Sequence, residues 1–99
     1  MARFDVYRDP DGRGYLLDVQ ANIMGHLNTR IVVPLMPPDV APKPAKGMNP
    51  EFLIGGVPVV MVTQFLAAVP ISTLKEQVST LDPHRTVIAD AIDLLLQGF

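Results

Sequence analysis

Residues 52–62 read Phe-Leu-Ile-Gly-Gly-Val-Pro-Val-Val-Met-Val, and this stretch decides the fold class. Two apolar runs flank Gly55-Gly56, and glycine readily adopts the positive φ values that a two-residue primed turn requires. The stretch therefore predicts a β-hairpin with strands over residues 52–54 and 57–62.

An earlier hairpin is predicted near the N-terminus. Residues 4–7 and 15–20 alternate apolar with polar side chains, which is typical of half-buried strands. Between them, Asp9-Pro10-Asp11-Gly12 is strong turn chemistry, because Pro fixes φ and Gly allows positive φ. We expect the connecting loop over residues 8–14.

The middle of the chain predicts a buried strand followed by an irregular connection. Residues 31–35 form a continuous apolar run, and Pro34 within it should lie at a sheet edge or a bulge because it has no ladder donor. Residues 36–51 hold five prolines, which no regular element accommodates. Residues 66–69 fit either a helical turn or a strand, and residues 69–71 should be extended.

The C-terminal segment predicts one amphipathic helix. Asp82 suits the N-cap, Pro83 the first helical position and Gly98 the C-cap. An apolar stripe at helical spacing consists of Val87, Ile88, Ala91, Ile92 and Leu95. Because residues 94–96 are all leucine, the helix end is apolar most of the way round, which favours contact with a second copy or a partner. Together the elements indicate an antiparallel β-domain closed by one C-terminal helix.

Composition limits the classes of function. The chain has 99 residues, of which 48% are hydrophobic, more than a domain of this size readily buries. The surplus predicts a homodimer interface, and the alternative is an ordinary small domain with an apolar surface. A net charge of −2 with scattered Lys and Arg argues against direct nucleic-acid binding.

The compartment is predicted from cysteine and hydropathy. Cysteine is absent, which fits a reducing cytoplasm and excludes a disulfide framework. Charges interrupt the N-terminus, so it does not resemble a signal peptide. The longest apolar stretch, residues 57–71, is interrupted by polar and proline residues and is too short to span a bilayer. We expect a soluble protein with no membrane partner.

Candidate chemistry is sparse. His26 and His84 are far apart, and neither shows metal-ligand spacing, so we expect no metal and no cofactor. Asp18, His26, Thr29 and Arg30 are polar residues within a short span, and such residues can form an acid–base site for RNA cleavage. The favoured interpretation is structural, with Asp18 and Arg30 pairing within the sheet. We therefore predict a binding protein, with no catalytic residues.

Several short segments resemble the CcdB family, the toxins of bacterial toxin–antitoxin pairs. They occur in the family's order over essentially the whole chain, and the length also fits. The segments are Phe4-Asp5-Val6-Tyr7, Asp18-Val19-Gln20, residues 29–35, Val69-Pro70-Ile71 and residues 91–99.

The resemblance implies a concrete fold and function. It implies a single toxin domain over residues 1–99, with an SH3-like antiparallel barrel and a C-terminal helix, that forms a homodimer. Such a toxin binds the A subunit of DNA gyrase and traps the cleaved DNA complex. A CcdA-like antitoxin neutralises it, and the two proteins repress their own operon, with operator DNA contacted through the antitoxin.

The resemblance also assigns residues to three surfaces. Those matching gyrase-contacting positions are Ile23, Met24, Asp93, Leu96, Gln97, Gly98 and Phe99. Those matching the dimer interface are Ile23, Met24 and Leu95, and those in the region that the antitoxin touches are Tyr7, Arg8 and Arg13. The family ends in an aromatic–Gly–aliphatic tripeptide. Here it reads Gln97-Gly98-Phe99, so a stacking group is replaced by an amide.

Two alternative functions remain open at this point. The ribonuclease toxin MazF is similar to CcdB in fold, and Asp18, Thr29 and Arg30 are the residues to suspect for RNA cleavage. The replacement at Gln97 also fits a toxin relative that no longer poisons gyrase and serves as a partner of its antitoxin.

Overall fold

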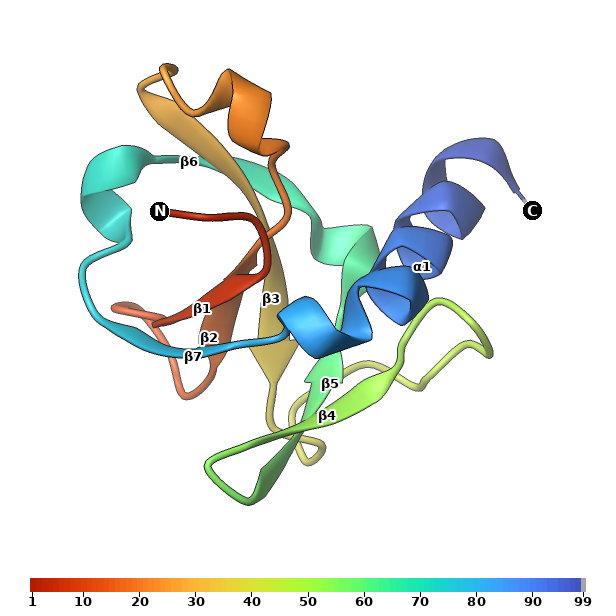
Figure 1. The fold of residues 1–99 in the computed structure, drawn as a ribbon. Coiled ribbons are helices and arrows are strands. Elements are labelled where there is room, and N and C mark those ends of the chain that lie inside the picture. Colours follow the sequence, from red (N-terminus) through yellow and green to blue (C-terminus); the bar gives the residue numbers. More distant parts are fainter. Residues whose placement is uncertain (99) are drawn as a thin grey trace.

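A computed structural model describes residues 1–98 (Figure 1). The strands of this part are β1 (Asp5–Arg8), β2 (Tyr15–Asp18), β3 (Thr29–Met36), β4 (Glu51–Ile54), β5 (Val57–Met61), β6 (Ala67–Pro70) and β7 (Gln77–Thr80). The α-helix is α1 (Arg85–Gln97), and the short 3₁₀ segments are η1 (Asn22–Met24), η2 (Thr63–Phe65), η3 (Ile71–Thr73) and η4 (Asp82–His84).

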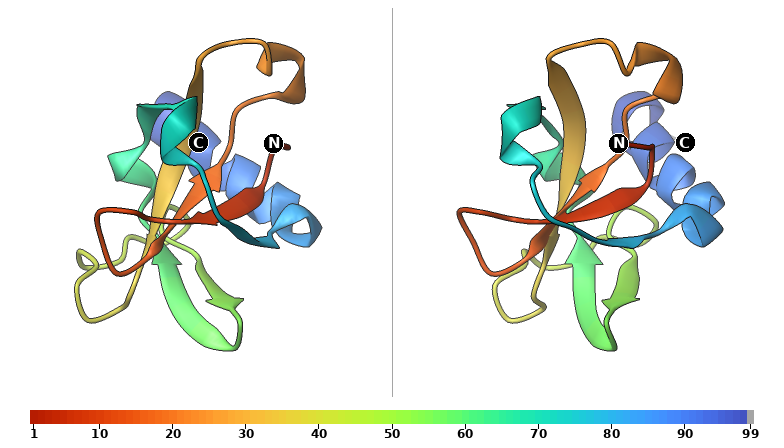
Figure 2. Two further views of the ribbon diagram at one scale, coloured as in Figure 1. Left: turned by 90° about the vertical axis from the view of Figure 1, so that its left-hand side faces the viewer. Right: turned by 60° about the vertical axis from the view of Figure 1, so that its left-hand side comes forward.

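The strands form one antiparallel sheet around the eight-residue strand β3. The order is β4-β5-β3-β2-β1-β7, and β6 also pairs with β3. One half of β3 therefore pairs with β6 and the other half with β5, which splits the sheet and bends it into an open half-barrel (Figures 1 and 2). The predicted mainly β fold with one C-terminal helix is confirmed.

The hairpin of residues 52–62 forms as predicted. β4 and β5 pair in register from Glu51 opposite Val60 to Ile54 opposite Val57. Gly55 and Gly56 occupy the turn with φ angles of 59° and 82°. Positive φ at both central positions is the reason that glycine is needed here.

The first hairpin is also confirmed, with its loop closed by glycine. The Asp9 amide donates to the Gly14 carbonyl at 3.1 Å, next to the pairing of Arg8 with Tyr15. A Cβ atom on residue 14 would overlap the backbone carbonyl of Leu35 on β3. The loop therefore passes so close to the central strand that only glycine fits.

Pro34 does not lie at a sheet edge, which corrects the prediction. It is in the interior strand β3, opposite Leu16 of β2. Its carbonyl accepts a hydrogen bond from the Val62 amide at 2.9 Å, so its backbone polar groups face the side where β3 changes partner from β6 to β5. Pro34 has no backbone N–H, and this missing donor lies at the change of partner, where no hydrogen bond of the ladder needs it.

The proline-rich connection contains no helix or strand between β3 and β4, as predicted. Asn49, which is 9% exposed, holds it in place. The Asn49 side chain donates to the Met61 carbonyl at 3.0 Å and to the Gln64 side chain at 2.8 Å, and accepts from the Ala45 amide at 2.9 Å. A loop without regular structure is thus tied to the end of β5.

The helix α1 begins later than predicted. Asp82 and Pro83 lie in the 3₁₀ turn η4, and His84 precedes the first helical residue without a side-chain cap. The Asp82 carboxylate instead pairs with Arg85 at 2.8 Å, so its predicted N-cap role is wrong. Gly98 ends the helix in the left-handed conformation (φ 78°), and its amide donates to the Leu94 carbonyl, as predicted.

The core lies between the sheet and the first half of α1. Ile88 and Ala91 are fully buried there, and Ile92 packs against the same cluster. Val87 is 47% exposed, so its predicted place in the core stripe is wrong. The other members of this cluster are Phe4, Val6, Leu17, Val19, Val33, Leu35, Phe52, Ile54, Val59, Met61 and Leu81.

A second, smaller cluster packs on the other side of the sheet. It contains Tyr7, Leu16, Val32 and Leu74. The strand β7, which pairs with β1, was not anticipated because its sequence Gln-Val-Ser-Thr is mostly polar. Within residues 1–98, no helix has the length and apolar character needed to cross a membrane.

Candidate protein-binding surface

An ordered turn between β2 and β3 presents apolar side chains to solvent. Residues 22–24 form η1, closed by hydrogen bonds from Met24 to Ala21 and from Gly25 to Asn22. Ile23 is 84% exposed and Met24 is 40% exposed. Two adjacent apolar side chains exposed on an ordered turn make this turn a candidate protein-binding surface.

Gln20 fixes this turn to the sheet. Its side-chain amide donates to the Met24 carbonyl at 2.9 Å, and its side-chain carbonyl accepts from the Ile31 amide at 3.0 Å. Gln20 is only 6% exposed, so both bonds are shielded from water. The turn that carries Ile23 is therefore positioned by a buried side chain.

Behind Gln20 lies a buried ion pair between Asp18 and Arg30, as the favoured interpretation of the sequence predicted. The two side chains are 0% and 1% exposed. One Asp18 carboxylate oxygen accepts from Arg30 Nε at 2.9 Å and lies 2.6 Å from Nη2, which is not oriented for a hydrogen bond. The other oxygen accepts from the Gln20 amide at 3.0 Å.

Burial and pairing act in opposite directions on Asp18. Loss of hydration raises the pKa of its carboxyl above the usual range, while the hydrogen bond from Arg30 opposes that rise. Because the pair is inaccessible, neither Asp18 nor Arg30 can reach an RNA substrate in this conformation. Of the residues considered for RNA cleavage, only His26 and Thr29 are exposed.

The last turns of α1 present the second exposed apolar group. Leu96 is 69% exposed, Asp93 and Gln97 are exposed, and Leu95 is half-buried. Figure 1 shows this end of α1 projecting from the body, on the same upper side as the 22–24 turn. Phe99, assigned to the same surface by resemblance, lies outside the described residues.

The residues assigned to the antitoxin are in two environments. Tyr7 is 4% exposed and packs in the smaller cluster, so its side chain is not accessible to a partner in this conformation. Arg8 is exposed, pairs with Glu76 at 2.8 Å and lies 5.7 Å from the Tyr15 ring centroid. Arg13 is exposed and pairs with Asp39 at 2.9 Å.

Arg3, which the sequence did not single out, lies beside the 22–24 turn and faces the first half of α1. Its backbone amide donates to the Asn22 side chain at 2.8 Å, and its Nε donates to the Val19 carbonyl at 3.1 Å. Its guanidinium stacks on the Phe4 ring at 4.8 Å from the centroid. The only signal was a cation followed by an aromatic residue, which is too common to single out.

The described residues offer little to a metal ion. No group of three or more His, Asp or Glu side chains within residues 1–98 is placed to hold one. His84 packs beside Phe52, with ring centroids 5.2 Å apart. The described surface instead carries exposed apolar groups on elements that buried polar contacts hold in place.

Comparison with known proteins identifies the family of this domain and a solved structure with a similar fold. The family profile described as "CcdB protein" matches residues 3–98. No curated protein sequence matches the chain. Among solved structures, the Mycobacterium tuberculosis toxin MazF-mt6 aligns with a TM-score of 0.74 at 15% identity, covering 93% of this chain and 95% of that one. At that identity the likeness concerns the fold alone.

The fold first defines a class, the small mainly β domains with an open half-barrel sheet and one C-terminal helix. Within that class, the chain belongs to the CcdB family, since the family match spans nearly its whole length. Membership indicates the toxin component of a toxin–antitoxin system, and it implies an antitoxin partner.

Proposed function

We propose that this protein binds the A subunit of DNA gyrase and traps the enzyme's cleaved DNA complex. Residues 1–99 act as a single toxin domain and form a homodimer. The observation that carries the proposal is the family match over residues 3–98. The described surface supports it, because Ile23 and Leu96 are exposed at two of the matching positions.

The proposed gyrase surface combines the 22–24 turn with the end of α1. Ile23, Met24 and Leu96 supply apolar contact area, and Asp93 supplies a charge at the rim. Gln97 stands where the family has an aromatic residue, so contact area is smaller there. Ile23 and Met24 are also proposed for the dimer interface, together with the half-buried Leu95, so on one copy these two side chains contact either the second copy or gyrase.

A CcdA-like antitoxin is the proposed neutralising partner. Arg8 and Arg13 are exposed on the first hairpin, where an acidic segment of the antitoxin can replace Glu76 and Asp39 as their partners. Tyr7 supports the strand that carries Arg8. In this proposal the complex of the two proteins represses the operon, and operator DNA is contacted by the antitoxin.

The decisive experiment mixes the purified protein with DNA gyrase, ATP and supercoiled plasmid, followed by protein denaturation and electrophoresis. Accumulation of linear plasmid is the expected result, because a trapped cleavage complex releases broken DNA on denaturation. Unimpaired supercoiling without linear plasmid would reject gyrase poisoning and favour a relative that retains only antitoxin binding.

Two further experiments test the role of the C-terminal residues and the alternative ribonuclease function. Deletion of residues 97–99 should abolish poisoning while the fold and antitoxin binding persist, since these residues follow the part of α1 that packs on the core. A ribonuclease function would instead require RNA cleavage that Arg30→Ala removes. The burial of Arg30 at 1% exposure weighs against that outcome.

A further inference from the structure

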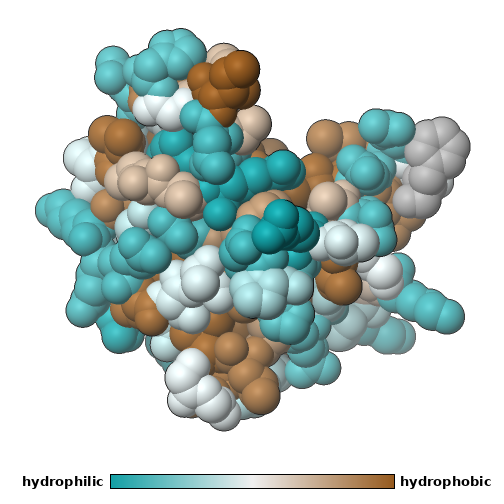
Figure 3. Space-filling view, in the orientation of Figure 1, coloured by the Kyte–Doolittle hydropathy of each residue, from teal (hydrophilic) through white to brown (hydrophobic). Residues whose placement is uncertain are grey.

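A polar groove separates the 22–24 turn from α1. It has a volume of about 450 Å³, and it is bordered on one side by Arg3, Phe4 and Asn22. The first half of α1 and the preceding turn form the other side, through Asp82, Arg85, Thr86, Ala89 and Asp90. Figure 3 shows hydrophilic side chains at the centre of this face of the molecule. The groove thus lies beside the 22–24 turn and along the half of α1 that precedes the proposed gyrase contact at the helix end.

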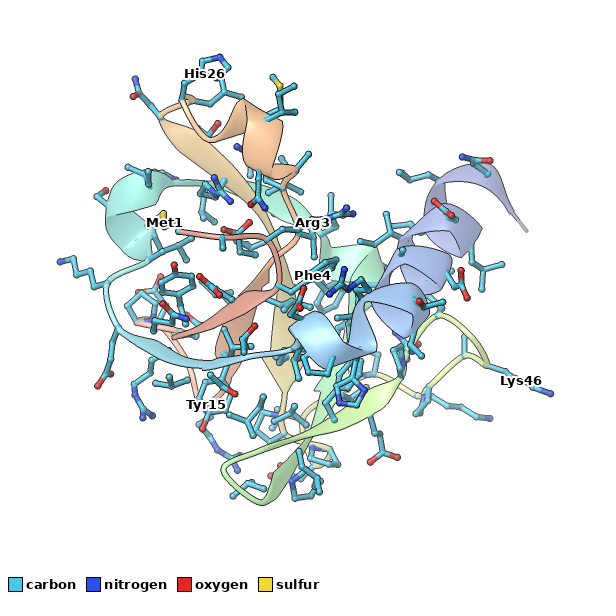
Figure 4. The ribbon with its side chains drawn as sticks, viewed as in Figure 1. Met1, Arg3, Phe4, Tyr15, His26 and Lys46 are labelled. Carbon is cyan, nitrogen blue, oxygen red and sulfur yellow. The ribbon has the colours of Figure 1, made fainter. Side chains whose placement is uncertain are left out.

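The backbone around Arg3 is held rigidly. Phe4 has a φ angle of 76°, which is rare and strained for a bulky residue. Its amide donates to the Asp18 carbonyl at 2.6 Å, and its carbonyl accepts from the Leu81 amide at 2.8 Å. These bonds and the burial of the Phe4 ring maintain the strained conformation, which directs the preceding residue toward α1 (Figure 4).

The Arg3 side chain is preorganised with one edge free. Its Nε is bonded to the Val19 carbonyl, and its plane stacks on Phe4. Among residues 1–98, no carboxylate pairs with its terminal nitrogens. A stacked, half-buried guanidinium whose two terminal nitrogens have no carboxylate partner matches the geometry of a carboxylate, and it loses little side-chain entropy on binding.

The charges opposite Arg3 indicate the kind of partner. Arg85 is neutralised by Asp82, whereas Asp90 has no ion-pair partner within the described chain. The groove therefore offers one free cation and one free anion. A phosphate backbone would meet the Asp90 carboxylate, so a protein segment with both signs of charge fits better than DNA.

We propose that this groove receives a loop of the gyrase A subunit through an acidic side chain on Arg3 and a basic side chain near Asp90. This inference rests on the proposed gyrase function and extends its contact surface beyond the apolar residues. It makes Arg3 a residue that sets specificity, because a partner without the acidic group leaves the guanidinium unpaired.

The test measures affinity of the full chain and its variants for purified gyrase A subunit by calorimetry, without DNA. Arg3→Ala should weaken binding about 10- to 100-fold, as expected for a central arginine contact. Arg3→Lys should weaken binding by a smaller factor than Arg3→Ala, because lysine keeps the positive charge but lacks the planar guanidinium. Asp90→Asn should weaken binding by a smaller factor. Raising the salt concentration should reduce the difference between wild type and Arg3→Ala.

Lys75→Ala is the matched control, since Lys75 is an exposed cation outside the groove. Thermal unfolding verifies that each variant is folded, and Asp90→Asn tests the groove from a surface position if Arg3→Ala does not fold. If Arg3→Ala and Asp90→Asn both bind gyrase A subunit as tightly as the wild type, the proposed groove contact is wrong while gyrase binding stands. Losses that appear only when DNA is added indicate phosphate recognition and also overturn it. No binding by wild type rejects both proposals together.

Discussion

Two Asp–Arg pairs in this protein have the same chemistry and opposite surroundings. Asp18 and Arg30 are buried at the centre of the sheet, whereas Arg13 and Asp39 are about two-thirds exposed between two loops. The buried pair organises the turn that carries Ile23 through Gln20. The exposed pair contributes little to the fold because solvent screens it, which leaves Arg13 available for the proposed antitoxin contact.

The largest expected effect is on the buried pair. Arg30→Met leaves the Asp18 carboxylate buried without its cation, and we expect a loss of about 3–5 kcal/mol in the free energy of unfolding. Urea denaturation measures it. The double variant Asp18→Leu with Arg30→Met should recover part of the loss, because no charge then stays buried. A single variant as stable as wild type would show that the pair is dispensable.

Gln20→Leu removes the link from the buried pair to the exposed turn. The Ile31 amide and the Met24 carbonyl lose their partners, so we expect a cost of about 1–3 kcal/mol. Amide hydrogen exchange should accelerate at Ile31, and gyrase binding should weaken more than the stability loss explains. Unchanged exchange at Ile31 would contradict the positioning role.

The pKa values of the two carboxyls should be shifted in opposite directions from the ordinary aspartate value. Burial raises the pKa of Asp18, while the hydrogen bond from Arg13 lowers the pKa of Asp39. Asp18 holds its proton more tightly in the folded chain, so its contribution to stability falls as the pH rises through its folded pKa. Asp39 contributes stability above its unfolded pKa, and this is lost as the pH falls through its folded pKa. Carbon-detected NMR titration of both carboxyls distinguishes them, and equal midpoints would refute the contrast.

The smallest expected effect on stability is at the exposed pair. Arg13→Ala should leave the urea midpoint unchanged within error and return the pKa of Asp39 toward its ordinary value. Antitoxin affinity should nevertheless fall, in contrast to Lys75→Ala. A clear loss of stability in Arg13→Ala would mean that the exposed pair is structural after all.

Local signals in the sequence predicted the elements that local chemistry controls. The Gly55-Gly56 turn and the Gly98 cap follow from backbone conformations that glycine favours, and both are confirmed. The N-terminus of α1 was wrong because Asp82 pairs with Arg85 inside a 3₁₀ turn, a competing local arrangement that the capping pattern does not exclude.

Features that depend on distant parts of the chain were not predictable in the same way. Pro34 is interior because β3 exchanges one partner strand for another at that position, which only the assembled sheet determines. The resemblance assigned Tyr7 to the antitoxin region, but in the fold Tyr7 is buried in one cluster with Leu74 and Val32. The position of Arg3 depends on Phe4 and Val19, and its proposed role also depends on α1 across the groove.

The close approach at Gly14 sets a limit on how this protein can diverge. The loop over residues 8–14 faces solvent and can vary to follow a changing antitoxin, yet its last position admits no side chain. In a mutant library selected for retained growth arrest, we expect broad tolerance at Asp11 and Arg13 and glycine alone at position 14. Specificity for the antitoxin can therefore drift while the spacing between the hairpin and the central strand stays constant.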